Sequence, residues 1–124
     1  MIFVGNDLVE VDRIQTLIER WADRFLMRIF TGDEITYCQR QVQPAVHFAG
    51  RFAAKEAVKK VLYSAGRTEP ILFRQIQVDR DLFGAPLVKV TGLDRELQVS
   101  ISHTTRYAMA TAVMLKSDPT GESG

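Results

Sequence analysis

Residues 50–62 read Gly-Arg-Phe-Ala-Ala-Lys-Glu-Ala-Val-Lys-Lys-Val-Leu, a run of helix-forming residues with no proline and with glycine only at its start. At about 3.6 residues per turn, the small and branched apolar residues of this run fall on one stripe. The stripe consists of Gly50, Ala54, Ala57, Val58 and Val61. We therefore expect a long helix, from about Ala45 to Tyr63, that packs its apolar stripe against the rest of the domain.

The flank of this helix carries a cluster of charges. Arg51, Lys55 and Lys59 follow one another at i, i+4 spacing, and Glu56 and Lys60 form another such pair. One carboxylate among four cations suits a site that binds a metal ion together with a polyphosphate. The alternative is a surface helix with solvated charges, and for this helix taken alone it is the simpler interpretation.

Length and composition indicate one ordinary globular domain. The chain has 124 residues, of which 46% are hydrophobic and 25% are charged, and its formal net charge of +1 gives no argument for nucleic-acid binding. The single cysteine, Cys38, excludes an internal disulfide and fits a reducing compartment. Acidic residues interrupt the N-terminal apolar run, and no apolar run approaches the roughly 20 residues of a membrane span. We expect a cytoplasmic protein without a membrane or nucleic-acid partner.

Helical patterns dominate the first half of the chain. A short apolar strand, Met1–Val4, ends at turn-prone residues 5–7. A helical pattern runs from Asp12 to Phe30, with a break near Ala22 left open, and a short helix follows from Thr31 towards Gln41.

Strand patterns dominate the second half. Phe73–Asp79 and Leu87–Val90 predict a hairpin around Gly84, and two further strands follow at Leu97–His103 and Arg106–Leu115. This order predicts an α+β fold in which an antiparallel sheet packs against the long helix. We expect residues 1–116 to form a single domain and residues 117–124 to be a disordered tail.

Two residues outside the long helix are candidates for chemistry. Asp7, at the end of the first strand, is equally well interpreted as a metal ligand or catalytic acid and as a helix cap. His103 stands between Ser102 and Thr104, which suits phosphate binding, although a core histidine is the simpler alternative. We interpret His47, near the start of the long helix, as a partly buried packing residue.

The helical region before the long helix carries a row of arginines. Arg20, Arg24 and Arg28 lie one turn apart, opposite the apolar face. A solvated, partly salt-bridged face is the ordinary interpretation. The functional alternative is a docking ridge for an acidic partner, because the planar guanidinium binds carboxylates through two hydrogen bonds.

Three motifs together resemble one enzyme family. Residues 5–14, Gly-Asn-Asp-Leu-Val-Glu-Val-Asp-Arg-Ile, resemble the N-terminal motif of the holo-acyl-carrier-protein synthases. Residues 50–57 resemble the central signature of this 4'-phosphopantetheinyl transferase family, and residues 100–104, with Tyr107-Ala108 after them, resemble its C-terminal motif. The resemblance extends from Met1 to about Val113 and preserves the order and spacing of the motifs.

The resemblance implies a reaction and a set of site residues. Such enzymes transfer 4'-phosphopantetheine from coenzyme A to a serine of an apo acyl carrier protein and release adenosine 3',5'-bisphosphate. Asp7 and Glu56 match the carboxylates that hold Mg²⁺, and a catalytic lysine falls at Lys59 or Lys60. The residues expected to contact coenzyme A are Arg51, Lys55, Lys59, His103 and Thr104. A metal-bound water and Glu56 both remain candidates for the general base.

The resemblance also implies partners. The family docks its small acidic carrier protein on arginines of the first helix, which here are Arg13, Arg20, Arg24 and Arg28. Family members are typically trimers with each active site between two subunits. A non-catalytic module that binds coenzyme A or a nucleotide and docks an acidic protein is the main alternative, and a Mg²⁺-dependent phosphohydrolase is another. The presence of both Asp7 and Glu56 favours the transferase.

Overall fold

The computed structural model describes residues 1–115, so the expected disordered tail at 117–124 lies outside the described residues. The first half contains β1 (Ile2–Glu10), α1 (Val11–Trp21), α2 (Asp23–Ile29), α3 (Gly32–Gln39) and α4 (Pro44–Ser64). The second half contains a 3-10 turn η1 (Phe73–Gln75), β2 (Ile76–Arg80), β3 (Pro86–Val90), β4 (Leu97–His103) and β5 (Tyr107–Leu115).

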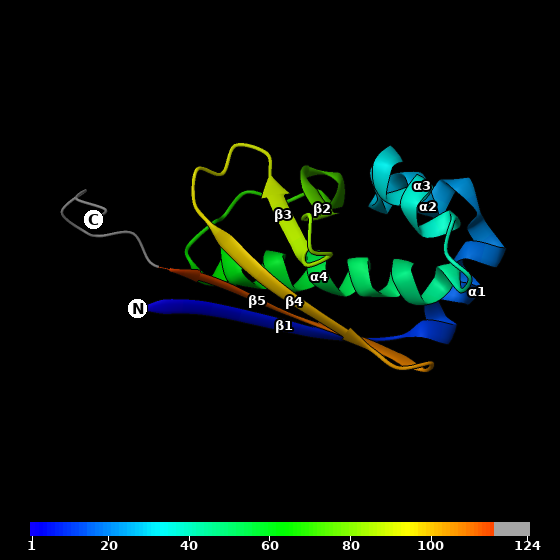
Figure 1. Cartoon of the computed structure of the whole chain (residues 1–124). Coiled ribbons are helices and arrows are strands. Elements are labelled where there is room, and N and C mark those ends of the chain that lie inside the picture. The colour runs from blue at the N-terminus through cyan, green and yellow to red at the C-terminus, as the bar shows by residue number, and fades with distance from the viewer. Residues whose placement is uncertain (116–124) are drawn as a thin grey trace.

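Helix α4 forms the middle layer of the domain. On one side it lies along a three-stranded antiparallel sheet with the order β1-β5-β4, and on the other side are the β2–β3 hairpin and the short helices (Figure 1). The apolar stripe of α4 is buried as predicted, and it faces small residues of β5, Ala108, Ala110 and Ala112, that are at most 1% exposed. These alanines let the helix lie close to the sheet. The predicted α+β architecture around a long central helix is confirmed.

The turn predicted at residues 5–7 is wrong, because these residues continue β1. The strand pairs with β5 over its whole length, from Ile2 opposite Leu115 to Glu10 opposite Tyr107. A Cβ atom at Gly5 would lie only 2.4 Å from the carbonyl oxygen of Ala57, so this glycine allows close packing of β1 on α4. The side chain of Asp7 therefore projects from within the sheet on the face that packs against α4.

One element boundary that the sequence left open is now defined, and one other differs from the sequence prediction. The pattern from Asp12 to Phe30 divides at Ala22, whose φ of 45° ends α1, so the break left open is present. The strand predicted from Phe73 begins only at Ile76, because Phe73–Gln75 form a 3-10 turn. Gly84 has a φ of 83°, as its place in the hairpin turn requires.

The sheet face turned away from α4 carries exposed apolar side chains. It includes Ile2, Val4, Leu8, Tyr107, Met109 and Leu115, which are each between 41% and 67% exposed. In the described part of the chain no element covers this face (Figure 1). Among the helices of residues 1–115, none combines the length and apolar character needed to cross a membrane.

Candidate active site

A lysine–carboxylate contact joins α4 to β1. The Nζ atom of Lys60 lies 3.2 Å from Oδ1 of Asp7 and donates a hydrogen bond of 2.8 Å to the carbonyl oxygen of Asn6. The expected Glu56–Lys60 pair does not form, since Lys60 reaches to the strand instead. Lys59 points elsewhere, and its Nζ lies 3.4 Å from the centroid of the Phe73 ring. Lys60, rather than Lys59, therefore lies beside Asp7.

The carboxylates of Asp7 and Glu56 suit a hard divalent cation. Residues four apart on a helix share a face, so Glu56 lies on the side of α4 from which Lys60 reaches Asp7. Within residues 1–115 there is no cluster of three or more His, Cys, Asp or Glu side chains that could hold a metal ion. A site with two protein carboxylates, completed by substrate phosphate and water, is the arrangement that Mg²⁺ commonly accepts.

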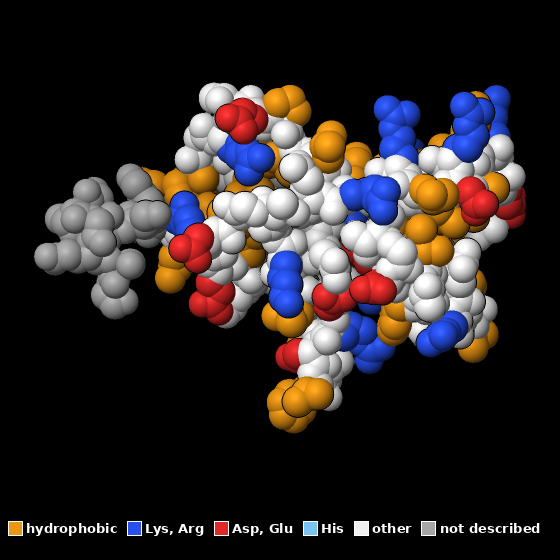
Figure 2. All heavy atoms as spheres, turned by 90° about the horizontal axis from the view of Figure 1, so that it is seen from above, with side chains coloured by type: hydrophobic (Ala, Val, Ile, Leu, Met, Phe, Trp, Pro, Cys, Tyr) orange, Lys and Arg blue, Asp and Glu red, His pale blue; other side chains and the backbone are white. Residues whose placement is uncertain are grey.

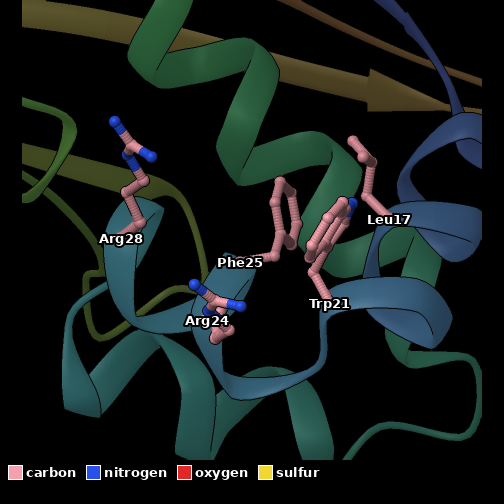
Figure 3. Close-up of a pocket in the computed structure, with 5 residues that line it drawn as sticks. All are labelled: Leu17, Trp21, Arg24, Phe25 and Arg28. Atoms are coloured by element: carbon pink, nitrogen blue, oxygen red, sulfur yellow. The ribbon is translucent and has the colours of Figure 1, made fainter.

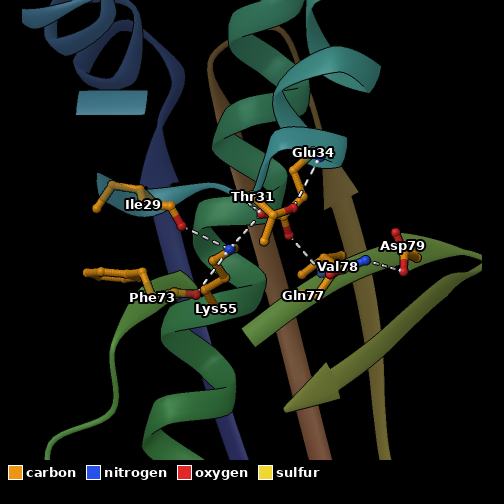
Figure 4. Close-up of polar contacts among 8 residues, drawn as sticks. All are labelled: Ile29, Thr31, Glu34, Lys55, Phe73, Gln77, Val78 and Asp79. Atoms are coloured by element: carbon orange, nitrogen blue, oxygen red, sulfur yellow. Dashed lines mark hydrogen bonds and ion pairs between the residues drawn. The ribbon is translucent and has the colours of Figure 1, made fainter. Parts of the chain in front are cut away.

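Lys55 is not placed to bind a phosphate. Its side chain is fully buried, and its Nζ donates to the carbonyl oxygens of Ile29 (2.9 Å) and Phe73 (3.1 Å) and lies 2.7 Å from Oε1 of Glu34 (Figure 4). An ammonium group has three donors, and all three are used. The prediction that Lys55 contacts coenzyme A is therefore wrong, because packing of α3 and the hairpin on α4 turns this position into the interior.

Glu34 completes this buried cluster. Its Oε1 also accepts from the backbone N–H of Thr31 and its Oε2 from that of Val78, both at 2.7 Å (Figure 4). Burial lowers the pKa of Lys55, and the adjacent Glu34 carboxylate opposes that shift. The pair ties α3 and β2 to α4. We call Glu34, Lys55 and the four backbone groups that they bind the Lys55 cluster.

A second buried cation of α4 lies in a different environment. Arg51 is 7% exposed, and its guanidinium lies 4.2 Å from the centroid of the Tyr37 ring. Its Nε has no hydrogen-bond partner, which makes it the one such buried side-chain nitrogen or oxygen within residues 1–115. Buried polar groups normally have partners, so an unpartnered donor indicates a place for a ligand acceptor.

Arg51 faces a pocket of about 200 Å³ between α3, α4, the hairpin and β4. His103 also lines it, so the structure brings together residues of the central and C-terminal motifs. The Thr104 hydroxyl next to it accepts hydrogen bonds from the backbone N–H groups of Arg106 and Tyr107, which leaves its own O–H free to donate. We call this the Arg51 pocket; its other polar lining side chains are Tyr37, His47, Asp79 and Arg80.

Two of these lining residues have functional potential that the sequence did not reveal. His47 was interpreted as a packing residue, yet its i, i+4 spacing from Arg51 was a signal that both share a helix face. Arg80 had no local signal, because only the folding of the hairpin over Tyr37 brings its guanidinium 5.0 Å from that ring. Burial and the charge of Arg51 lower the pKa of His47, with His103 and Arg80 contributing.

The predicted docking arginines are exposed, but they do not form one ridge. The break at Ala22 leaves Arg20 on α1 and places Arg24 and Arg28 on α2. Arg20 and Arg24 still converge, because their guanidinium groups lie 5.5 Å and 6.0 Å from the centroid of the Trp21 ring. Arg13 is exposed near the start of α1. Basic side chains gather with exposed hydrophobic ones at the end of the molecule formed by the short helices (Figure 2).

A pocket of about 330 Å³ opens between α1 and α2. Its lining residues are Leu17, Trp21, Arg24, Phe25 and Arg28. In Figure 3 the aromatic rings of Trp21 and Phe25 face the same space from the two helices, with the arginines at its edge. An apolar hollow beside exposed cations suits a partner that combines apolar and acidic side chains.

Comparisons with known proteins agree with the three motifs. The model of the 4'-phosphopantetheinyl transferase superfamily matches residues 3–112. The holo-[acyl-carrier-protein] synthase of Protochlamydia amoebophila (strain UWE25) is 42% identical over 116 residues, which cover 89% of this chain and 94% of that protein.

Solved structures agree in fold. Helicobacter pylori holo-[acyl-carrier-protein] synthase in complex with coenzyme A is 30% identical, with a TM-score of 0.80 over 90% of this chain and 99% of that chain. The Bacillus anthracis synthase in complex with CoA (3',5'-ADP) is 31% identical, with a TM-score of 0.78 over 93% of this chain and 96% of that chain. The predicted fold type is confirmed, and the chain belongs to the 4'-phosphopantetheinyl transferase superfamily.

Proposed function

We propose that this protein transfers 4'-phosphopantetheine from coenzyme A to a serine hydroxyl of an apo acyl carrier protein and releases adenosine 3',5'-bisphosphate. The observation that carries the proposal is the Arg51 pocket, which the buried Arg51 and His103 line together. Such donors suit the phosphates of coenzyme A. Known synthases with 30–42% identity to this chain, two of them in complexes with CoA, support the same reaction.

The side chains divide the work by charge. Arg51, His103 and Thr104 bind phosphate oxygens and fix the orientation of coenzyme A. Asp7 and Glu56 would hold Mg²⁺, which would supply positive charge to neutralise the pyrophosphate that is cleaved. Lys60 holds the Asp7 carboxylate in place through their 3.2 Å contact and adds positive charge near the leaving group. Glu56 is a candidate base for the serine proton.

The carrier protein docks on the face formed by α1 and α2. Arg13, Arg20, Arg24 and Arg28 supply positive charge for an acidic surface. The pocket between Trp21 and Phe25 accepts an apolar side chain of the same partner. Surface charges act mainly on the association rate and on the salt dependence of binding, whereas a filled apolar pocket slows dissociation.

The active protein is a homotrimer that works in the cytoplasm. The support for self-association is the uncovered apolar face of the β1-β5-β4 sheet, since monomeric proteins rarely leave such a face in water. The support for a reducing compartment is that Cys38, the one cysteine, is buried as a free thiol.

Intact-mass spectrometry of an apo acyl carrier protein, incubated with this protein, coenzyme A and Mg²⁺, tests the reaction. We expect the carrier protein to gain one phosphopantetheine, and we expect no gain with EDTA or with Glu56→Ala. Binding of coenzyme A without any gain on several carrier proteins would favour the non-catalytic module. Cleavage of coenzyme A without a carrier protein would favour the phosphohydrolase.

A docking variant separates the two substrates. Arg24→Glu should raise the KM for the carrier protein by about tenfold at low salt, because it places a like charge opposite an acidic partner. The KM for coenzyme A should stay the same, since the Arg51 pocket is formed by other elements. Equal increases in both KM values would contradict the docking surface.

A further inference from the structure

The Arg51 pocket contains a histidine without an assigned role. His47 precedes Arg51 by one helical turn on α4, and its ring centroid lies 5.8 Å from that of His103 on β4. Neither ring has a hydrogen-bond partner within residues 1–115. Both histidines line the same pocket as Arg51, whose buried Nε has no hydrogen-bond partner. Two histidines and an arginine thus line one space.

Charged and titratable groups surround His47, and they come from every element packed against it. Tyr37 of α3 meets the His47 ring edge-on with 6.0 Å between centroids, and Arg51 lies on the same helix. Asp79 and Arg80 come from β2, where Asp79 accepts a hydrogen bond of 2.8 Å from Gln77 and Arg80 binds the Tyr37 hydroxyl. His103 comes from β4. The pocket is lined by two guanidiniums, two imidazoles and one carboxylate, so it favours an anion.

We propose that His47 binds a phosphate group of coenzyme A together with Arg51 and takes up a proton as it does so. This proposal rests on the proposed function and adds a residue to it. In the free protein, burial disfavours the charged imidazole, and Arg51, His103 and Arg80 add to this effect, so the pKa of His47 is lowered from its usual 6.5. A phosphate dianion reverses that effect, because an adjacent negative charge stabilises the imidazolium.

The direction of the pH dependence follows from this change in charge. Between the lower pKa of free His47 and the higher pKa of the bound form, binding takes up a proton, so a fall in pH strengthens binding through His47. The second pKa of a phosphate monoester, about 6, acts in the opposite direction, because the ligand loses negative charge there. The contribution of His47 is therefore the difference between the wild type and a variant that does not titrate.

Isothermal titration calorimetry with coenzyme A tests this difference. We would measure the wild type, His47→Phe and His47→Gln at about pH 6 and about pH 8, in buffers of different ionisation enthalpy to count protons. At about pH 6, His47→Phe should bind about tenfold more weakly than wild type, with a smaller difference at about pH 8. His47→Gln, which keeps an N–H donor, should recover part of the affinity without the proton uptake.

Two further ligands identify which phosphate is bound. If His47 holds the 3'-phosphate, His47→Phe should weaken adenosine 3',5'-bisphosphate but leave dephospho-coenzyme A unchanged. If it holds the pyrophosphate, dephospho-coenzyme A should be weakened as well. Either pattern supports the proposal. Equal affinity and equal proton uptake of all three proteins for every ligand would overturn it, even where phosphopantetheine transfer proceeds.

An experiment on the wild type needs a variant only to assign one signal. The chain contains two histidines, so its NMR spectrum should show two imidazole Cε1–H signals, which His47→Gln assigns. The titration of the His47 signal should move to higher pH when adenosine 3',5'-bisphosphate is added. An unchanged titration in the presence of a bound ligand would reject the proposal but not the transferase function. A protein that binds none of these ligands would reject both.

Discussion

The Lys55 cluster and the Arg51 pocket each contain a buried cation of α4. The two cations lie one helical turn apart, but their hydrogen bonding differs. Lys55 is fully buried with three acceptors for its three donors, one of them the Glu34 carboxylate. Arg51 is almost as buried, but its Nε has no partner, and it faces an open pocket. A satisfied buried ion belongs to the fold, whereas an unsatisfied one indicates a ligand. Equal burial therefore does not mean an equal role.

The largest effect should follow the loss of Lys55. Lys55→Met leaves the buried Glu34 carboxylate and two backbone carbonyls without their donor, so we expect the free energy of unfolding to fall by about 3–5 kcal/mol. Urea denaturation measures this change. The matched control is Lys60→Met on the same helix, where the Lys60 side chain is 53% exposed and pairs with Asp7 near the surface. That change should cost less than about 1 kcal/mol, and equal losses would remove the distinction.

The next effect concerns binding instead of folding. Arg51→Met removes a cation whose Nε has no protein partner, so the free energy of unfolding should change by less than about 1 kcal/mol. The Kd for coenzyme A should rise by about 10- to 100-fold, because charge-assisted hydrogen bonds to phosphate are lost. Calorimetry and urea denaturation of the same samples check both parts. Arg51→Lys should recover little affinity, since it keeps the charge but not the planar fork.

The difference between these two regions marks the limit of what the sequence predicts. The apolar stripe of α4 and the alternation of β4 are local patterns, and both were predicted correctly because burial of one face imposes a period on the sequence. The i, i+4 spacing correctly made Arg51 and Lys55 neighbours. It could not say that their flank is covered, because α3 and the hairpin that bury it come from other parts of the chain.

The same limit applies to the site residues, of which the sequence could identify Asp7 but not the surroundings that form the Arg51 pocket. Asp7, Glu56 and His103 could be selected because they stand in motifs that resemble a known family. The strand around Asp7 was mistaken for a turn, because Gly5 serves close packing on α4 and its sequence signal is the same as that of a turn glycine. Arg80 enters the pocket only through the tertiary position of the hairpin. Motifs thus selected candidate groups, whereas the surroundings of those groups follow only from the tertiary structure.

The smallest expected effect tests whether water reaches the interior between the Lys55 cluster and the Arg51 pocket. Cys38 is fully buried, and burial raises the pKa of its thiol from 9.0 to about 12, with Glu34 adding to the shift and Arg51 and Lys55 opposing it. Because the folded pKa is the higher one, the thiol's contribution to stability is complete below about pH 9 and is lost as the pH rises towards about 12. Between pH 9 and 10 it should remove about 1 kcal/mol. Cys38→Ala should lack this loss, while the other groups that titrate in this range are common to both proteins. Parallel curves of unfolding free energy against pH for the two proteins would mean that water reaches the thiol, and that the Lys55 cluster is not sealed from the pocket beside it.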